Sequence, residues 1–177
     1  MRGDMPPELR TARLVLRPLT AADVEDLHAL WTAPGVRRYL WDDAVIPREQ
    51  TAAVVTESEH LFADAGYGLF GARRPSPNEL IGFGGYWHFR GAPDPELLYG
   101  VAEAEWGRGF ATEIAGAVLA HGVERLGLRE VRASTDAPNA ESARVLEKLG
   151  FRLERWAVVG GLDTLFLRYA ADVPRSA

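Results

Sequence analysis

The sequence lacks cysteine and long apolar runs, and each absence excludes a class of protein. Without cysteine the chain forms no disulfide, no zinc site built on thiolates and no cysteine nucleophile. No stretch approaches the roughly 20 apolar residues that a membrane-spanning helix needs. Met1–Pro7 contains no apolar run after its arginine, so we expect no secretory signal. These absences predict a cytoplasmic protein that does not enter a membrane.

Basic residues are also in the minority. The chain has 20 Lys and Arg residues against 25 Asp and Glu residues, for a net charge of −5. Proteins that bind nucleic acids usually carry a basic excess, so the charge argues against DNA or RNA as a direct partner. The 177 residues are 47% hydrophobic and 25% charged, a composition typical of one globular domain. We therefore expect a single domain over residues 1–177.

The spacing of apolar residues predicts strands and helices that follow one another along the chain. The expected strands are Arg13–Leu19, Tyr67–Ala72, Glu79–Phe89, Glu96–Val101, Arg129–Thr135, Arg152–Val159 and Leu162–Tyr169. The expected helices begin near Thr20, Arg48, Phe110 and Pro138. Gly84-Gly85 inside a strand suggests a bulge or a close backbone approach. This order predicts an α/β or α+β fold, with a mixed sheet of about seven strands and about four helices.

The most informative stretch is Trp106–Glu113, which lies between an expected strand and an expected helix. Gly107 and Gly109 let the backbone approach a ligand closely, and the helix N-terminus offers unpaired N–H groups. Together they form an anion cradle for a phosphate or pyrophosphate, to which Arg108 adds a charge. The stretch is neither a Walker loop nor a Rossmann fingerprint, and a turn that only feeds the helix is an equal alternative.

A second feature lies at the start of the last expected helix. Asn139 and Ser142 are three residues apart and share one helix face, which Leu146 and Leu149 continue toward the core. Two small polar groups there are placed to meet a polar ligand at the edge of a cleft. The alternative, which is favoured for this pattern alone, is that both side chains satisfy local backbone groups.

The four histidines do not predict a metal site. His28, His60 and His88 lack metal-ligand spacing with one another. His121 falls on the apolar face of its helix, at helical spacing from Ile114 and Val118, and is expected to be a half-buried packing residue. We therefore expect no bound metal.

Four segments, in this order and spacing, closely resemble the GNAT superfamily of N-acetyltransferases. They are Thr11–Leu19, Glu96–Val101, Trp106–Glu113 and Asn139–Phe151. The resemblance spans about residues 9–169, which we take as the core between short flexible termini, and is greatest to the branch of ribosomal-protein N-terminal acetyltransferases. Two positions depart from the wider family. Ala104 stands where Gln or Arg begins the loop pattern, and the last helix lacks the family's tyrosine acid, so Ser142 inherits that role.

The resemblance implies acetyl-CoA bound in a splayed gap between two parallel strands, Glu96–Val101 and Arg129–Thr135. It implies that backbone groups at Val101 pair with the pantetheine arm and that Asn139 contacts the same arm. It also implies that the family's pyrophosphate loop corresponds to Gly107–Thr112. The implied cofactor-binding residues are Val101, Trp106, Gly107, Arg108, Gly109, Phe110, Ala111, Thr112, Asn139 and Ser142. The segment Arg37–Asp42 would line the acceptor side.

Amine acetylation needs a base for the ammonium, donors for the oxyanion and a proton near the departing thiolate. Glu96 matches the family's base and Ser142 its acid, either directly or through water, and a backbone N–H near Val101 would meet the oxyanion. Without cysteine we expect direct transfer in a ternary complex. The acceptor is a primary amine, either a protein N-terminus or a small molecule, and of monomer and homodimer we favour the homodimer.

Two other readings stay open. One is a CoA-binding sensor or interaction module without transfer activity, and the presence of Glu96, Asn139 and Ser142 argues against it. The other is a nucleotide-binding regulatory domain, which explains the glycine loop but not the face formed by Asn139 and Ser142.

Overall fold

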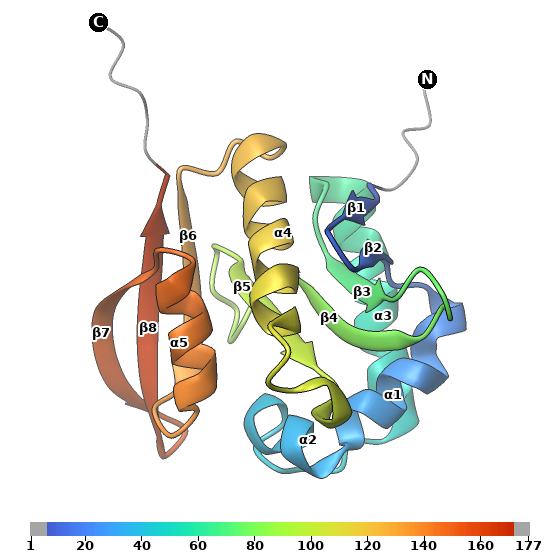
Figure 1. Cartoon of the computed structure of the whole chain (residues 1–177). Helices are drawn as coiled ribbons and strands as arrows, with labels where there is room; N and C mark the ends of the chain where they lie inside the picture. Colours follow the sequence, from blue (N-terminus) through green and yellow to red (C-terminus); the bar gives the residue numbers. More distant parts are fainter. Residues whose placement is uncertain (1–6, 172–177) are drawn as a thin grey trace, which may run out of the picture.

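The computed structural model describes residues 7–171, which form one twisted sheet with helices on both faces (Figure 1). The sheet has eight strands in the order β1-β2-β3-β4-β5-β6-β8-β7. The strands are β1 (Leu9–Arg10), β2 (Val15–Pro18), β3 (Leu69–Arg73), β4 (Leu80–Trp87), β5 (Glu96–Val101), β6 (Glu130–Asp136), β7 (Arg152–Val159) and β8 (Leu162–Ala170). The helices are α1 (Val24–Thr32), α2 (Pro34–Leu40), α3 (Arg48–Ala65), α4 (Phe110–Glu124) and α5 (Ala140–Lys148).

The mixed α/β fold predicted from the sequence is confirmed, with one more strand and one more helix than expected. The additional strand is β1, which has two residues and pairs with β2. The additional helix is α2, which begins with a proline in its first turn. Thr20 does begin a helical segment, but that segment is a 3₁₀ turn, Ala21–Asp23, which leads into α1. The short termini lie outside the described residues.

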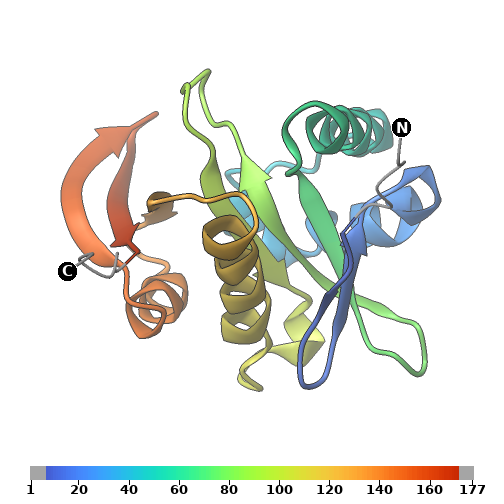
Figure 2. The same ribbon diagram turned by 90° about the horizontal axis from the view of Figure 1, so that it is seen from above.

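Two hydrophobic clusters hold the sheet between its helices. Helices α4 and α5 cover one face, and α1 and α3 lie on the other (Figure 2). The first cluster joins α4 to the sheet through Phe110, Ile114 and Val118, all buried, as their helical spacing predicts. The second cluster includes Trp31 of α1 and Phe83 of β4. The sheet therefore carries a separate hydrophobic layer on each of its faces.

Glycines in β4 bring helix α4 close to the sheet. A Cβ atom added at Gly84 would lie 2.6 Å from the Ile114 side chain, and one at Gly85 would lie 2.0 Å from the Gly68 carbonyl oxygen. The close approach expected at this glycine pair is confirmed. The bulge is not there, because the pairing is regular at both glycines and shifts instead between Ala72 and Arg73. The packing fixes α4, and with it the loop at its N-terminus.

Candidate active site

Strands β5 and β6 are the only parallel neighbours in the described sheet, and they pair at one position. Glu96 lies opposite Arg132, and no further pair joins the two strands. By contrast, β5 pairs with β4 over six positions, from Glu96 to Val101. The β5–β6 ladder is therefore open toward the C-terminal ends of both strands. This is the splayed strand pair that the sequence resemblance implies.

Backbone groups of β5 face this opening. The N–H group of Ala102 donates to the Ile81 carbonyl oxygen at 2.8 Å, on the β4 side. Backbone groups alternate in direction along a strand, so those of Val101 and Tyr99 point toward β6. The Val101 carbonyl oxygen already accepts a hydrogen bond from the Trp106 indole N–H at 2.8 Å. The Val101 N–H group is left as a donor that faces the gap.

The glycine loop lies directly beyond the end of β5. Gly107 and Gly109 have φ angles of 73° and 81°, a left-handed conformation that residues with a Cβ atom rarely adopt. Gly109 is the N-cap of α4, and no side chain caps the helix there. The first N–H groups of a helix have no partner within the helix, so this end carries unpaired donors and a partial positive charge. The geometry suits an anion and agrees with the predicted cradle.

Three arginines surround the loop, and sequence reasoning singled out only one. Arg108 forms an ion pair with Glu105 at 3.1 Å, and Arg74 pairs with the same carboxylate at 2.6 Å. The guanidinium of Arg13 lies 4.1 Å from the centre of the Phe110 ring. Arg13 falls in a segment that carried the family resemblance, but nothing in the sequence places Arg74 here. The loop therefore has more guanidinium groups around it than its own residues suggest, each of them held by Glu105 or Glu113.

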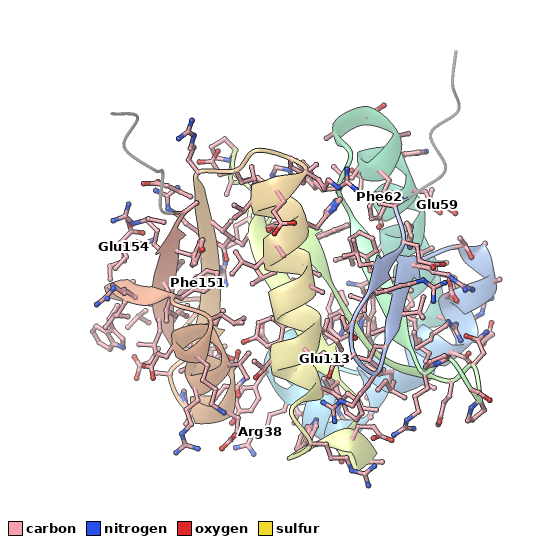
Figure 3. All side chains as sticks on the ribbon, turned by 45° about the horizontal axis from the view of Figure 1, so that its top comes forward. Arg38, Glu59, Phe62, Glu113, Phe151 and Glu154 are labelled. Atoms are coloured by element: carbon pink, nitrogen blue, oxygen red, sulfur yellow. The ribbon has the colours of Figure 1, made fainter. Side chains whose placement is uncertain are left out.

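Glu113, in the first turn of α4, holds Arg13 in place (Figure 3). Its carboxylate accepts from the Arg13 backbone N–H at 2.9 Å, from its Nε at 2.8 Å and from the Thr11 hydroxyl at 2.5 Å. Burial raises the pKa of Glu113, but the hydrogen bonds from Thr11 and Arg13 outweigh it, so the pKa lies below its ordinary value. Glu113 thus stays ionised at neutral pH and ties the β1–β2 segment to α4.

Asn139 and Ser142 lie at the opposite side of the gap, at the start of α5. Asn139 is the N-cap, and its side-chain oxygen accepts from the Ser142 backbone N–H at 3.3 Å. The local role that the sequence left open is therefore present. The Ser142 hydroxyl lies 2.9 Å from the Tyr99 hydroxyl, and Tyr99 also donates to the Ser142 carbonyl oxygen at 2.9 Å. Burial raises the pKa of Tyr99 to about 12. Sequence reasoning did not single out Tyr99.

Glu96 lies at the closed end of the gap and on the other face of the sheet. Leu97 belongs to the cluster beneath α4, so the alternating side chain of Glu96 points to the face that carries α1 and α3. Its carboxylate accepts a hydrogen bond from the Ser134 hydroxyl at 2.6 Å. Glu96 and Ser142 therefore stand on opposite faces of the splayed pair and share no hydrogen bond among residues 7–171.

Asp136, at the end of β6, has an electrostatic neighbour from another part of the chain. Burial raises the pKa of Asp136, the nearby Asp42 carboxylate raises it further, and Arg90 opposes both effects. Asp42 follows α2, with a left-handed φ of 50°. The end of the Arg37–Asp42 segment is thus close enough to influence the open end of β6.

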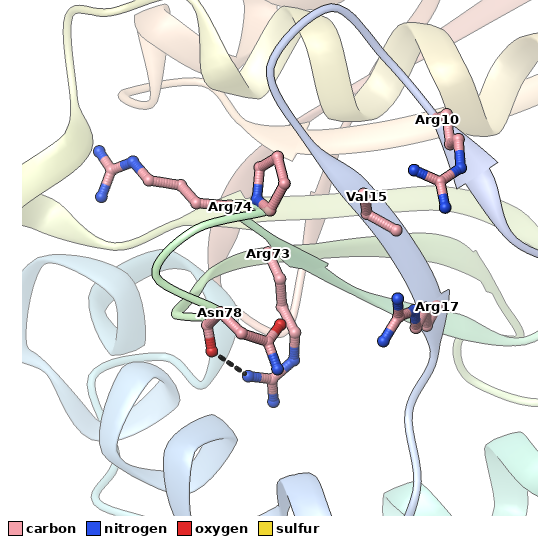
Figure 4. A pocket seen from close by; sticks show the side chains of 7 residues that line it. Arg10, Val15, Arg17, Arg73, Arg74 and Asn78 are labelled. Atoms are coloured by element: carbon pink, nitrogen blue, oxygen red, sulfur yellow. Dashed lines mark hydrogen bonds between the residues drawn. The ribbon is translucent and has the colours of Figure 1, made fainter.

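An open cavity of about 140 Å³ lies beside β1, β2 and β3 and shares Arg74 with the surroundings of the glycine loop (Figure 4). It is lined by Arg10, Val15, Arg17, Arg73, Arg74, Pro75 and Asn78. Each arginine is paired with a carboxylate: Arg10 and Arg17 with Glu8, Arg73 with Asp23 and Arg74 with Glu105. The arginines at the α4 terminus are paired with carboxylates too, but the cavity is a weaker candidate for an anion because its lining offers no unpaired N–H groups of a helix N-terminus.

Metal-ligating side chains do not gather in the described part of the chain. No group of three or more His, Cys, Asp or Glu residues is placed there to hold a metal ion. His121 is buried at 7% exposure, with its ring 5.7 Å from the Phe70 ring, and burial lowers its pKa. It is thus more fully buried than the half-buried packing position expected.

Within residues 7–171, none of the helices combines the length and apolar character needed to cross a membrane.

Comparison with known proteins identifies the family. Residues 13–152 match the family described as Acetyltransferase (GNAT) domain. The N-acetyltransferase YoaA of Bacillus subtilis (strain 168) is 31% identical over 153 residues, which are 84% of this chain and 84% of that protein. A crystal structure of an acetyltransferase from Agrobacterium tumefaciens C58 superposes with a TM-score of 0.81 at 28% identity, covering 93% of this chain and 95% of that one.

A solved structure from the branch that the sequence resembles also has the fold of this chain. It is RimL, a ribosomal L7/L12 alpha-N-protein acetyltransferase, in complex with coenzyme A. The TM-score is 0.78 at 20% identity, with 93% of this chain and 98% of that one covered. The splayed parallel pair, the glycine-capped helix and the match over residues 13–152 lead to one conclusion: the chain belongs to the GNAT family of acetyltransferases.

Proposed function

We propose that this acetyltransferase uses acetyl-CoA and passes the acetyl group directly to a primary amine in a ternary complex. The observation that carries the proposal is the single Glu96–Arg132 pair between β5 and β6, beside a helix whose N-terminus no side chain caps. An extended cofactor arm fits along an unpaired strand, where it takes the place of a neighbouring strand. The anionic end of the cofactor then meets the N–H groups of α4.

The cofactor residues are assigned on this geometry. The pyrophosphate would lie against the loop Gly107–Thr112, with Arg108 in reach and Trp106 fixing the end of β5 through its bond to Val101. The pantetheine arm would run along β5 past Val101 toward Glu96. Asn139 and Ser142 would border it from α5. RimL, which has the same fold, was solved with CoA joined to one of its cysteines by a disulfide; it supports CoA as the cofactor, whereas the residue assignment rests on the geometry alone.

In the reaction, each polar group has one task. The acceptor amine must lose a proton before it attacks, and Glu96 is the base that takes this proton, directly or through water. The Val101 N–H group faces the gap and donates to the thioester oxygen as negative charge develops there. Ser142 donates toward the departing sulfur. Because Glu96 and Ser142 occupy opposite faces of the sheet, the amine and the cofactor would approach from opposite sides.

The experiment that tests the proposal is a calorimetric titration with acetyl-CoA, followed by thioester consumption with a panel of amines. The panel contains peptides with free N-termini, a polyamine and an aminoglycoside. Stoichiometric binding with turnover of at least one amine is expected. Binding without turnover on any amine would favour the alternative, an inactive CoA-binding sensor. Protection by ATP without binding of acetyl-CoA would instead favour a nucleotide-binding regulatory domain.

The role of Glu96 has its own test. In Glu96→Gln the amine is no longer deprotonated by the enzyme, so we expect a rate loss of about 10²-fold that is largest at low pH, where the free amine is protonated. The measurement is the pH dependence of the rate with the best amine of the panel. A profile identical to that of the wild type would remove Glu96 from the mechanism.

The acceptor class, the assembly and the cellular location belong to the same proposal. We propose a protein N-terminus or a small amine as acceptor and a cytoplasmic location. A homodimer is supported by β7, which ends the described sheet and exposes Leu153, Trp156 and Val158 by 61%, 58% and 60%. Unpaired edges and exposed apolar side chains are typical of interfaces. Sedimentation of the wild type and of Trp156→Glu tests this, with a dimer and a monomer as the expected results.

A further inference from the structure

The side chain of Tyr99 crosses the opening between the two splayed strands. Tyr99 belongs to β5, whereas Ser142 belongs to α5, the helix that follows β6. The Tyr99 hydroxyl lies 2.9 Å from both the Ser142 hydroxyl and the Ser142 carbonyl oxygen. These contacts join residues 43 positions apart and link the two sides of the gap. A purely local role, such as the Asn139 cap, requires no partner on the opposite strand.

Counting hydrogens fixes the direction of both hydrogen bonds. A carbonyl oxygen only accepts, so the single phenol hydrogen of Tyr99 is the one donated to the Ser142 carbonyl. With that hydrogen used, the bond between the two hydroxyls is donated by Ser142 to the Tyr99 oxygen. In this arrangement the Ser142 hydrogen points at Tyr99, and no hydrogen is directed at a ligand in the gap.

The hydroxyl pair has a second arrangement that uses the same two oxygens. If Tyr99 turns its hydrogen from the carbonyl to the Ser142 hydroxyl oxygen, the Ser142 hydrogen is released to a new acceptor. The distances are equal, so the change needs a rotation of the phenol hydrogen and no movement of the backbone. Because burial holds the phenol neutral at physiological pH, Tyr99 acts only as a donor of a hydrogen bond and loses no proton.

We propose that Tyr99 is a positioning residue for Ser142: it directs the serine hydroxyl hydrogen toward the departing sulfur of CoA once that sulfur acquires negative charge. No proton leaves either hydroxyl in this step. The C–S bond of the thioester breaks, the sulfur keeps the electron pair as a thiolate, and Ser142 donates a hydrogen bond to it while accepting one from Tyr99. The inference rests on the proposed use of acetyl-CoA and adds a residue and a direction to it.

The experiment compares the affinities of CoA and acetyl-CoA by calorimetry at pH 7 and pH 9. Acetyl-CoA has no free thiol but shares the other titrating groups of CoA. The ratio of the CoA affinity to the acetyl-CoA affinity therefore reports only the ionisation of the thiol. A hydrogen bond to the thiolate stabilises its charged form. In the wild type, the ratio of the CoA affinity to the acetyl-CoA affinity should therefore rise by about tenfold from pH 7 to pH 9, and we call this rise the gain. The readout needs no acceptor amine.

Four variants separate positioning from a structural role. Ser142→Ala should abolish the gain, Tyr99→Phe should reduce it by about threefold or more, and the double variant should match Ser142→Ala alone. The matched control is Tyr86→Phe, since Tyr86 also donates a phenol hydrogen to a helix carbonyl, that of Val118 at 3.1 Å. It lies in the buried core, and its removal should leave the gain unchanged.

The outcomes distinguish the inference from the function beneath it. If both cofactors bind but the gain is absent in the wild type, or is unchanged in Tyr99→Phe or in Ser142→Ala, the positioning role is overturned while the cofactor site stands. Additive losses in the double variant would likewise show that Tyr99 does not act through Ser142. If neither cofactor binds the wild type, the proposed function fails, and the inference fails with it.

Discussion

Helices α4 and α5 both begin beside the splayed pair, yet their N-termini are built differently. At α5 the Asn139 side chain accepts from the Ser142 N–H, so the chain supplies its own cap. At α4 the N-cap is Gly109, which has no side chain to offer. A glycine N-cap costs roughly a few tenths of a kcal/mol of stability compared with a capping Asn, Asp or Ser side chain. The uncapped terminus is therefore the one that retains donors for a ligand.

The charged side chains around the two helix N-termini also differ. Arg13, Arg74 and Arg108 gather at α4. At α5 the acidic residue of the first turn, Glu141, is 84% exposed and pairs only with Arg144, on its own helix. The difference teaches that α4 is arranged for an external anion, whereas α5 is arranged to hold its own polar side chains in place.

The largest expected effect comes from giving α4 a side chain at its N-cap. Gly109→Val places a branched residue at a φ of 81°, which is strained and closes the approach to the N–H groups. We expect the affinity for acetyl-CoA to fall by about 10²-fold, as measured by calorimetry. Gly161→Val is the matched control, because Gly161 has a φ of 83° and open space around it, in the β7–β8 turn. An equal loss in both variants would show that strain alone, and not the loop, governs binding.

A smaller effect, on stability, is expected from replacing the acidic residues in the first turns of α4 and α5. Glu113→Gln should lower the free energy of unfolding by about 2 kcal/mol at pH 7, because the carboxylate accepts three hydrogen bonds there. The folded-state pKa of Glu113 is lowered, so its contribution is present above the ordinary glutamate pKa and is lost as the pH falls below it. Urea unfolding at pH 7 and pH 4 measures this.

The control for this prediction lies on α5. Glu141→Gln removes a surface ion pair, which is worth about 0.5 kcal/mol or less. If Glu113→Gln cost no more than Glu141→Gln, or if its effect did not shrink at low pH, the proposed difference between the two first turns would be wrong.

The smallest effect is expected at the cap of α5. Asn139→Ala removes the acceptor for the Ser142 N–H, and we expect a loss of about 1 kcal/mol in the free energy of unfolding. Asn139→Asp keeps that acceptor and should retain the stability. If the amide N–H₂ group of Asn139 also contacts the cofactor, Asn139→Asp will bind acetyl-CoA more weakly despite its stable fold. Equal affinity would leave Asn139 with the capping role alone.

Much of the fold was predictable because it depends on local patterns. The helical spacing of Phe110, Ile114 and Val118 predicted α4 and its buried face correctly. The glycines at 107 and 109 marked a turn that the φ angles confirm. By contrast, β1 has two residues, and α2 has a proline and a glycine within its first two positions. Tertiary contacts stabilise such short elements, so their own sequences carry little signal.

The candidate site divides in the same way. The loop residues and Asn139 lie in contiguous motifs, and the sequence alone pointed to them. Arg74 reaches Glu105 from 31 positions away, and Tyr99 reaches Ser142 from 43. These contacts arise from the order of the strands in the sheet and from the packing of the segments that follow β3, β5 and β6, a fact of topology that no single segment encodes. The expected splay of β5 and β6 came from a family resemblance and not from the residues of either strand.

A crystal structure with acetyl-CoA bound is the most direct test of the central claim. We predict the pyrophosphate against the backbone N–H groups of residues 107–112 and the thioester between β5 and β6, with its oxygen toward the Val101 N–H. Acetyl-CoA bound elsewhere, such as on the arginines beside β1 and β2, with the α4 terminus unoccupied, would contradict the account.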